Sequence, residues 1–497
     1  MRHAFQFKVN FKGGIISPGY LYNLLESLQK GGLKKVRFGL RQQLLIDVAK
    51  KDYKNIVAAL DSTGINYEIN KDVYPNINSS YSAAEIFIKD TWVGEGVYKD
   101  VFDLFNYKPK LKINIADRNQ TFMPFFTGNI NWIASKQNHF WYLYIRFPKT
   151  NILFEWKELI YTNDIARLSN EIEKVIFKER LFYFNNNAAD GNKLYLNVTS
   201  QNTFISKPVT EKLELPSFKL PYYEGFNSYG TKLWLGIYRR DELFEINFLK
   251  DICHVCLETK AGELYTTSWK SLIIKSIEDK DRSLWTFILN KHRINVRHAS
   301  NELNWQVEDA NETGLIIKRQ IIQEFEQHDV RTYGLCFAIK TQPAAGLYGS
   351  VLVQRQFNLI RGTLKPLNKF DILYTADFNP NSKDFILFRN NVEKEHLPAY
   401  LMGLCKYFYE QESAGDLLPG STYTEDKDSP KQPVEKYIYQ CHHCMTVYDE
   451  EAGEPENGIA EGTLFEALPE NYCCPLCEAP KNDFEKKEKK LLGLQSV

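Results

Sequence analysis

Residues 36–60 read VRFGLRQQLLIDVAKKDYKNIVAAL and residues 264–288 read LYTTSWKSLIIKSIEDKDRSLWTFI, so one pattern occurs twice in the chain. Each copy contains a short apolar strand, at 44–46 or 272–274, followed by a turn and an amphipathic helix. A further helix pattern precedes each copy, after Ser17 and before Gly262. Strand, helix, strand and helix in duplicate predict two related α+β halves.

The rest of residues 1–410, which we call the body, mixes strand and helix patterns. Apolar residues predict strands within 110–122, 140–147, 332–339, 349–357 and 370–378, and helices near 163–178, 315–327 and 393–411. A chain of 497 residues exceeds what one hydrophobic core usually supports. We therefore expect four domains in the body: half-domains at 1–75 and 226–300, and α/β domains at 76–225 and 301–410.

The composition changes behind the body. Residues 411–436 are rich in Gly, Ser, Thr, Pro and charged residues, which predicts a flexible linker. Residues 437–486 form a compact segment, here called the module, whose stretch 437–485 has eleven Asp or Glu and one basic residue, Lys481. Because the whole chain has 62 acidic and 62 basic residues, the remainder is basic. This split favours docking of the module on a basic surface of this chain or of a redox partner, and it gives no indication of nucleic-acid binding.

Two Cys-x-x-Cys pairs lie in the module. Cys441 and Cys444 form the first pair, and Cys474 and Cys477 form the second. Two residues between paired thiolates let a tight loop place both sulfurs on one metal, and two such loops complete a tetrahedral site. Four thiolates suit iron or zinc, and a site closed by four ligands leaves no position for a substrate.

The module resembles rubredoxin over its whole length. The resemblance rests on the cysteine spacing, on Tyr448-Asp449, Gly462-Thr463 and Leu468-Pro469, and on Lys481 and Phe484 after the Cys-Pro-x-Cys loop. It implies one iron at the four cysteines, cycling between the ferric and ferrous states, and a small aromatic core. The residues that it places in this core are Tyr439, Tyr448, Phe465, Tyr472 and Phe484.

The module also departs from the rubredoxin pattern. Rubredoxins usually have Gly directly after the second and fourth Cys, where this chain has Met445 and Glu478, and His443 replaces a small apolar residue. A side chain in left-handed backbone costs about 1–2 kcal/mol. Iron is the expected metal, and zinc stays an alternative. We expect Cys473, His442 and His443 outside the ligand set, because four thiolates already complete it.

The body resembles the siroheme-dependent nitrite and sulfite reductases, whose two ferredoxin-like halves surround a tetrapyrrole next to a [4Fe-4S] cluster. The resemblance lies in residues 36–43, VRFGLRQQ, a strand with an arginine, a short spacer and Arg-Gln. It implies Arg37 and Arg41 as ligands of siroheme carboxylates, on one side of the strand, whereas plain solvent exposure is the alternative. Arg118 and Arg146 are further candidates for the same anion pocket.

The body's cysteines do not follow the reductase pattern. The reductases hold their cluster with two cysteine pairs, whereas the body has one close pair, Cys253 and Cys256, and two distant single cysteines, Cys336 and Cys405. A [4Fe-4S] cluster is therefore not expected. Cys253 and Cys256 share the apolar stripe of a helix pattern, so we expect them, like Cys336 and Cys405, to pack in a core.

Three functions agree with these patterns. The preferred one is an electron-transfer protein, with the iron module tethered to a reductase-like body that docks a redox partner or binds a tetrapyrrole. The second is a siroheme nitrite or sulfite reductase fed by its own module. The third is a non-enzymatic assembly protein whose module is a zinc ribbon. No stretch has the length of a membrane span and no signal-peptide pattern occurs, so we expect a cytoplasmic protein.

Overall fold

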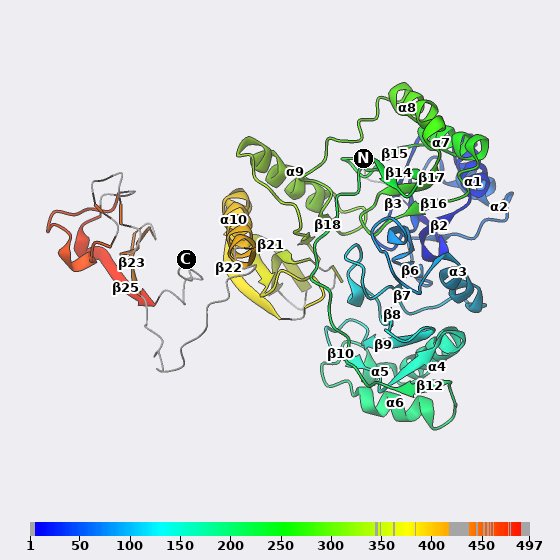
Figure 1. The fold of residues 1–497 in the computed structure, drawn as a ribbon, viewed down its shortest axis with the longest axis horizontal. Coiled ribbons are helices and arrows are strands. Elements are labelled where there is room, and N and C mark those ends of the chain that lie inside the picture. The colour runs from blue at the N-terminus through cyan, green and yellow to red at the C-terminus, as the bar shows by residue number, and fades with distance from the viewer. Residues whose placement is uncertain are drawn as a thin grey trace. The chain divides into compact units, whose positions relative to one another are not determined.

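The structure is a computed structural model of the chain. It describes residues 5–342, 346–347, 349–360, 363–382, 384–416, 437–443, 446–450, 453–454, 457, 459–460, 462–475, 477 and 479–488. The chain divides into two compact units, Met1–Ser413 and Ala414–Val497. The first unit contains the body and the second contains the module (Figure 1).

The first half of the repeat forms an antiparallel five-stranded sheet with the order β15-β3-β4-β1-β5. The first helix begins where the Ser17 side chain accepts a hydrogen bond from the Tyr20 N–H and Pro18 occupies the first turn. The elements of this half are β1 (Phe5–Val9), α1 (Pro18–Lys30), β3 (Lys35–Phe38), β4 (Leu44–Val48), α2 (Tyr53–Asp61) and β5 (Glu68–Ile69), joined by β15 (Phe244–Glu245).

The second half forms a matching antiparallel sheet with the order β13-β14-β17-β16-β2. Its elements are β13 (Gly225–Tyr229), β14 (Lys232–Ile237), α7 (Ile246–Thr259), β16 (Leu264–Thr266), β17 (Leu272–Ile277) and α8 (Arg282–Lys291), joined by β2 (Ile15–Ile16). Helices α1 and α7 pack against each other, and both halves contribute to one hydrophobic core (Figure 1).

The alignment that places position 36 on position 264 relates the two halves element by element. It carries β1, β3 and β4 onto β14, β16 and β17, and it carries α1 and α2 onto α7 and α8. Left-handed backbone recurs in the same alignment, in Gly14 and Glu242 and in Gln42 and Lys270. The strand before each long helix pairs with the other half, since β2 joins β16 and β15 joins β3. The predicted duplication is confirmed, and the halves exchange a strand.

The α/β domain that follows the first half has a sheet with the order β12-β11-β9-β8-β7-β6, and β10 pairs with β9. All seven residues of β9 are buried, which explains its nearly continuous apolar sequence. The elements are β6 (Asn78–Ser79), α3 (Glu95–Leu104), β7 (Ile113–Ala116), β8 (Ile130–Ala134), β9 (Phe140–Arg146), β10 (Leu153–Glu155), β11 (Glu158–Tyr161), α4 (Ile165–Lys178), α5 (Arg180–Tyr183), α6 (Gly191–Thr199) and β12 (Ser206–Pro208).

The α/β domain that follows the second half repeats this plan, with the sheet order β18-β19-β20-β21-β22. In each domain three strands pair in parallel and the next pairings are antiparallel. One helix follows the first strand of each sheet, and a second follows the antiparallel strands, α4 after β11 in the first domain and α10 after β22 in the second. The duplication therefore extends beyond the predicted half-domains. The elements are β18 (Trp305–Val307), α9 (Glu312–Gln327), β19 (Phe337–Lys340), β20 (Val351–Ile360), β21 (Thr363–Thr375), β22 (Phe385–Glu393) and α10 (Leu397–Asp416).

Helix α10 corrects the predicted linker, because it runs through residues 411–416, which we expected to be irregular. Residues 417–436 of that linker lie outside the described residues. The module has a three-stranded antiparallel sheet, β24-β23-β25, formed by β23 (Tyr437–Cys441), β24 (Val447–Tyr448) and β25 (Phe484–Glu488). Within the described ranges, no helix combines the length and the apolar character that crossing a membrane requires.

Candidate metal centre

Three of the four predicted ligands come together in the module. The sulfurs of Cys441, Cys474 and Cys477 all lie within 4.8 Å of one another, and those of Cys441 and Cys477 are 3.6 Å apart. Metal–sulfur bonds of about 2.3 Å place tetrahedral sulfurs roughly 3.8 Å apart, so these distances fit one shared metal ion. Cys444 lies outside the described residues, as do Met445 and Glu478.

Two loops with the same backbone closure carry these cysteines. The Cys441 N–H donates to the Thr446 carbonyl and the Cys474 N–H donates to the Ala479 carbonyl, each at 2.8 Å and each to the fifth residue along the chain. Cys441 and Cys474 are buried, whereas Cys477 is exposed. The sulfur cluster is therefore covered on the side of the sheet and reaches solvent at Cys477.

An aromatic core supports the two loops. Tyr439 stacks on Phe465 with ring centroids 4.0 Å apart, and Phe484 lies 5.4 Å from Phe465. Tyr448 and Tyr472 complete this core together with Leu468. All five aromatic residues that the rubredoxin resemblance implied are thus in contact, and they fix the strand ends from which the cysteine loops project.

The neighbouring thiol and imidazoles lie on the surface. Cys473 is exposed. His443 is 62% exposed, with its Nε2 2.9 Å from the Asp483 carboxylate, and His442 is 60% exposed near Glu485. These positions agree with the prediction that the three side chains stand outside the ligand set.

Arg37 and Arg41 have separate environments in the body. Arg37 forms an ion pair with Asp47 at 2.7 Å, and each side chain is only 11% exposed. Strand β3 ends at Phe38, so Arg41 lies in the following turn and not on the strand. The expectation that both arginines project from one side of a strand is therefore wrong, because the chain turns between them.

The Arg41 guanidinium connects the first half to the α/β domain beside it. It donates to the Asn76 carbonyl at 2.8 and 3.1 Å, to the Ile113 carbonyl at 2.7 Å and to Asn114 Oδ1 at 3.2 Å. Burial lowers the pKa of Arg41 to about 10. Its hydrogen-bonding capacity is mostly used within the protein, which indicates a structural role beside any role toward a ligand.

A cavity of about 300 Å³ lies next to Arg41, between the two halves and the α/β domains. Lys112 lines it together with Gln43 and Asp309. Gln43 donates from Nε2 to Asp309 at 3.0 Å, and its buried Oε1 accepts no hydrogen bond from the part of the chain that the structure describes. Burial raises the pKa of Asp309. Sequence reasoning missed these three residues as a group, although Gln43 and Lys112 lie within the segments that it singled out.

The other two predicted arginines, Arg118 and Arg146, also lie in separate environments. Arg118 lines a different pocket, with Lys136. Arg146 is buried on β9, donates to the Gly128 and Thr127 carbonyls, and lies close enough to Arg41 to influence its pKa. Of these two arginines, Arg146 therefore adds positive charge near the cavity at Arg41.

The four cysteines of the body are core residues, as predicted. All are buried: Cys253 and Cys256 in α7, Cys336 before β19 and Cys405 in α10. Burial raises the pKa of Cys253, Cys336 and Cys405 to about 12 and that of Cys256 still further. Among the described His, Cys, Asp and Glu residues, only the module cysteines gather as a candidate metal site.

In fold, the body resembles a solved protein. The structure of the Mycobacterium tuberculosis NirA protein superposes with a TM-score of 0.61, covers 82% of this chain and 81% of its own, and is 13% identical. This similarity supports the predicted duplicated α+β fold of the body.

The module matches rubredoxins in sequence. The rubredoxin family profile matches residues 438–484. Rubredoxin 4 of Rhodococcus sp. is 49% identical over 47 residues, which are 10% of this chain and 78% of that protein, and Rubredoxin-2 of Chlorobaculum tepidum is 44% identical over 48 residues, 10% of this chain and 92% of that protein. The high molecular weight rubredoxin of Moorella thermoacetica is 38% identical over 79 residues, 16% of this chain, and the match spans only 34% of that relative. Through residues 438–484 the chain belongs to the rubredoxin family.

Proposed function

We propose that the chain is a one-electron carrier whose iron is held by Cys441, Cys444, Cys474 and Cys477. The observation that carries the proposal is the convergence of three described sulfurs within 4.8 Å in a module of the rubredoxin family. When bound, the iron supplies a reversible ferric–ferrous couple. The cysteine loops hold four thiolates in a fixed cage, so a change of charge requires little rearrangement.

The exposure of the cysteines indicates where an electron enters and leaves the module. Cys441 and Cys474 are buried in one cluster with Ala479, against which Phe484 packs, whereas Cys477 is exposed to solvent. The exposed Cys477 side is therefore the proposed site of electron exchange with a partner protein.

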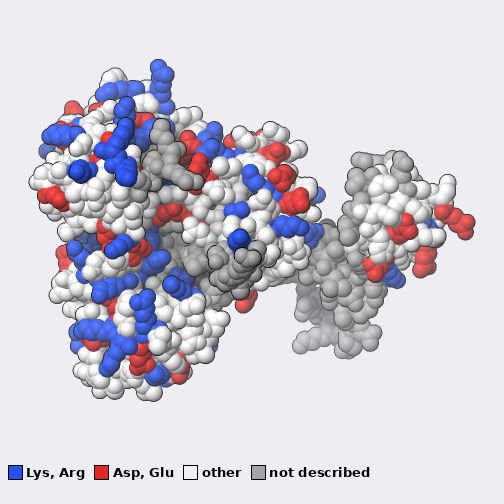
Figure 2. Space-filling model, turned by 180° about the vertical axis from the view of Figure 1, so that it is seen from behind, with Lys and Arg blue, Asp and Glu red and all other residues white. Residues whose placement is uncertain are grey.

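The partner's surface follows from charge. The stretch 437–485 has eleven acidic residues and one Lys, and Figure 2 shows acidic side chains on the module and basic ones spread over the body. Opposite charge accelerates encounter and is screened by salt. We infer a redox partner with a basic docking surface, in the cytoplasm.

Metal analysis and voltammetry of the full chain test the proposal. We expect one iron per chain and a reversible one-electron wave, both lost in Cys474→Ser and both kept in the matched control Cys473→Ser, whose thiol is exposed. Stoichiometric zinc without a redox wave contradicts the proposal and supports the zinc-ribbon alternative.

Kinetics test the charge argument separately. Electron transfer from the reduced module to a basic c-type cytochrome, used as a probe, should slow as salt is added. Transfer to ferricyanide, an anion, should accelerate, because salt screens repulsion in that case. The same salt dependence with both acceptors contradicts electrostatic docking.

A siroheme reductase is the second candidate, favoured by the positive charge of Arg41, Lys112 and Arg146 near one cavity of a reductase-like fold. These cations would face the carboxylates of the tetrapyrrole. Against it, Asp309 and Glu308 line the same cavity, and no cysteine lines it among the residues described. Siroheme absorption after co-expression with the enzymes of its synthesis would establish this candidate, and a body that stays colourless would exclude it.

A further inference from the structure

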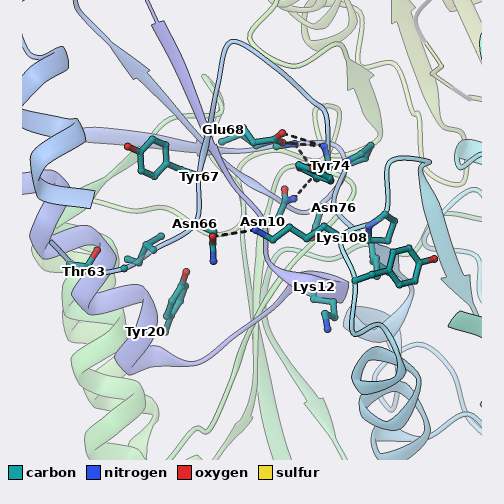
Figure 3. A pocket seen from close by; sticks show the side chains of 17 residues that line it. Asn10, Lys12, Tyr20, Thr63, Asn66, Tyr67, Glu68, Tyr74, Asn76 and Lys108 are labelled. Carbon is teal, nitrogen blue, oxygen red and sulfur yellow. Dashed lines mark hydrogen bonds and ion pairs between the residues drawn. The ribbon is translucent and has the colours of Figure 1, made fainter. Parts of the chain in front are cut away.

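A second cavity, of about 510 Å³, lies between the first half and the α/β domain that follows it (Figure 3). Its lining differs from that of the cavity at Arg41 in every residue. Small-molecule sites typically measure roughly 300–1,000 Å³, so the cavity has room for a ligand of mononucleotide size. The proposed electron transfer does not use it.

Aromatic rings form much of the wall. Tyr20, Tyr67, Tyr74 and Tyr107 line the cavity. Tyr20 presents a ring that is 41% exposed, and Phe11 supports it edge-on at 6.3 Å. The Tyr67 ring is held by a hydrogen bond from its hydroxyl to Asp61 at 2.8 Å. Supported rings of this kind favour flat ligands, because an aromatic face stacks on another planar ring at little entropic cost.

Three lysines line the same cavity, and one of them is neutralised. Lys8 forms ion pairs with Glu68 and Asp72 and is almost fully buried. Glu68 also accepts hydrogen bonds from the Val73 and Tyr74 N–H groups, so this ion pair fixes the loop 68–74 at the rim. Lys8 therefore contributes structure and little net charge.

The other two lysines bond to neutral acceptors. Lys12 donates to the Phe102 and Phe105 carbonyls at 2.9 and 3.2 Å. Lys108 donates to Asn66 Oδ1 at 3.2 Å (Figure 3). Neither forms an ion pair within the described part of the chain, although Asp103 acts on Lys12 from a distance. The Lys12 ammonium is thus held by carbonyls at the end of α3 and points away from Lys108, whereas Lys108 brings a positive charge without a bonded carboxylate to the cavity (Figure 3).

We propose that this cavity binds a planar aromatic anion of mononucleotide size, with its ring against Tyr20 and its phosphate or carboxylate at Lys108. Partial burial raises the pKa of Tyr20, although its ring stays 41% exposed at the cavity. A bound anion would use the remaining N–H donors of the Lys108 ammonium.

Calorimetric titration of the full chain with flavin mononucleotide as the probe tests the proposal. We expect flavin mononucleotide to bind. Riboflavin, which lacks the phosphate, should bind about tenfold more weakly, and inorganic phosphate, which lacks the ring, should bind more weakly still. Adenosine monophosphate should also bind, because the site recognises a ring and an anion. Absence of binding by both nucleotides up to millimolar concentration overturns the proposal.

Substitutions localise the binding. Tyr20→Leu and Lys108→Gln should each weaken flavin mononucleotide binding about tenfold, and both side chains are exposed, so both variants should fold. Lys54→Gln, an exposed lysine on α2 away from the cavity, is the matched control and should bind as the unaltered chain does. Equal affinity in all three variants contradicts the assignment to this cavity. The iron content and the redox wave should stay unchanged throughout, which separates this test from that of the proposed function.

Discussion

The module and the body place their cysteines in opposite environments. In the module, Cys441, Cys474 and Cys477 bring their sulfurs together at the ends of two loops. In the body, four cysteines lie apart in three elements or their flanks and are buried among apolar side chains. The same residue type is thus a ligand where loops converge and a small apolar side chain where helices and strands pack.

Core size explains the difference. The module's aromatic core contains five buried side chains, Tyr439, Tyr448, Phe465, Leu468 and Tyr472. The three main apolar clusters of the body are each far larger. Domains of about 50 residues rarely bury enough apolar surface to be stable alone, and a metal often supplies the missing free energy. The comparison therefore predicts that the module needs its metal to fold and that the body folds without it.

Metal removal should have the largest effect. Chelation under denaturing conditions, followed by refolding without metal, should leave the module unfolded, because metal–thiolate bonding supplies apparent free energies of roughly 10–16 kcal/mol in small zinc sites. All eight tryptophans lie in the body, so tryptophan fluorescence reports the body alone. We expect an unchanged fluorescence transition and rapid proteolysis of residues 437–486. A protease-resistant apo module would contradict the comparison.

Breaking a buried ion pair should have the largest effect on the body. Lys270 and Glu242 lie 2.7 Å apart, and each is 3% exposed. At the equivalent positions of the first half stand Gln42 and Gly14, which are neutral. Glu242→Gln should therefore lower the free energy of unfolding of the body by about 3 kcal/mol, the lower end of the range for a broken buried ion pair, since Lys270 loses its nearer carboxylate and keeps only Asp309 at 3.7 Å. Urea denaturation followed by tryptophan fluorescence measures this loss.

An exposed ion pair provides the matched control. Lys35 and Glu245 lie 3.1 Å apart and are about half exposed. Glu245→Gln should change the free energy of unfolding by less than about 1 kcal/mol. Equal losses in Glu242→Gln and Glu245→Gln would mean that burial does not determine the contribution of the pair. Iron content should stay the same in both variants.

The sequence predicted what depends on local spacing. The Cys-x-x-Cys pairs identified the three cysteines whose sulfurs converge, and the strand-turn-helix pattern at 36–60 and 264–288 identified the duplication. Long-range pairing was not readable, because the exchange of β2 and β15 between the halves depends on contacts between distant parts of the chain. The Arg37–Asp47 ion pair was missed for a related reason. Asp47 lies in the segment quoted first, but only the register of β3 on β4 brings it to Arg37.

The body's stability should also respond to pH through a buried lysine. Lys275 on β17 donates to the Tyr81 and Ala84 carbonyls, and burial lowers its pKa to about 7. The unfolded chain, with a lysine pKa near 10.4, binds more protons between these values. Burying the charged Lys275 therefore destabilises the folded body fully below pH 7. This destabilisation decreases as pH rises toward 10, by at most about 1.4 kcal/mol per pH unit.

Lys275→Met isolates this contribution. Relative to the variant, the unaltered body should gain stability from pH 7 to pH 10 in urea denaturation followed by tryptophan fluorescence. Tyrosines titrate in the same range, but they are common to both proteins and cancel in the difference. Parallel stability curves for the two proteins would show that Lys275 titrates normally in the folded body.

Removing one thiol of the body should have a small effect. Cys405 is 2% exposed in α10 and packs in the core of the last α/β domain. Cys405→Ala removes one sulfur atom and should lower the free energy of unfolding of the body by about 1 kcal/mol, because the small cavity loses contacts without exposing a polar group. Iron content and the redox wave should not change, whereas Cys474→Ser should remove both. If Cys405→Ala reduced the iron content, a cysteine of the body would take part in metal binding, and the division between ligand cysteines and core cysteines would fail.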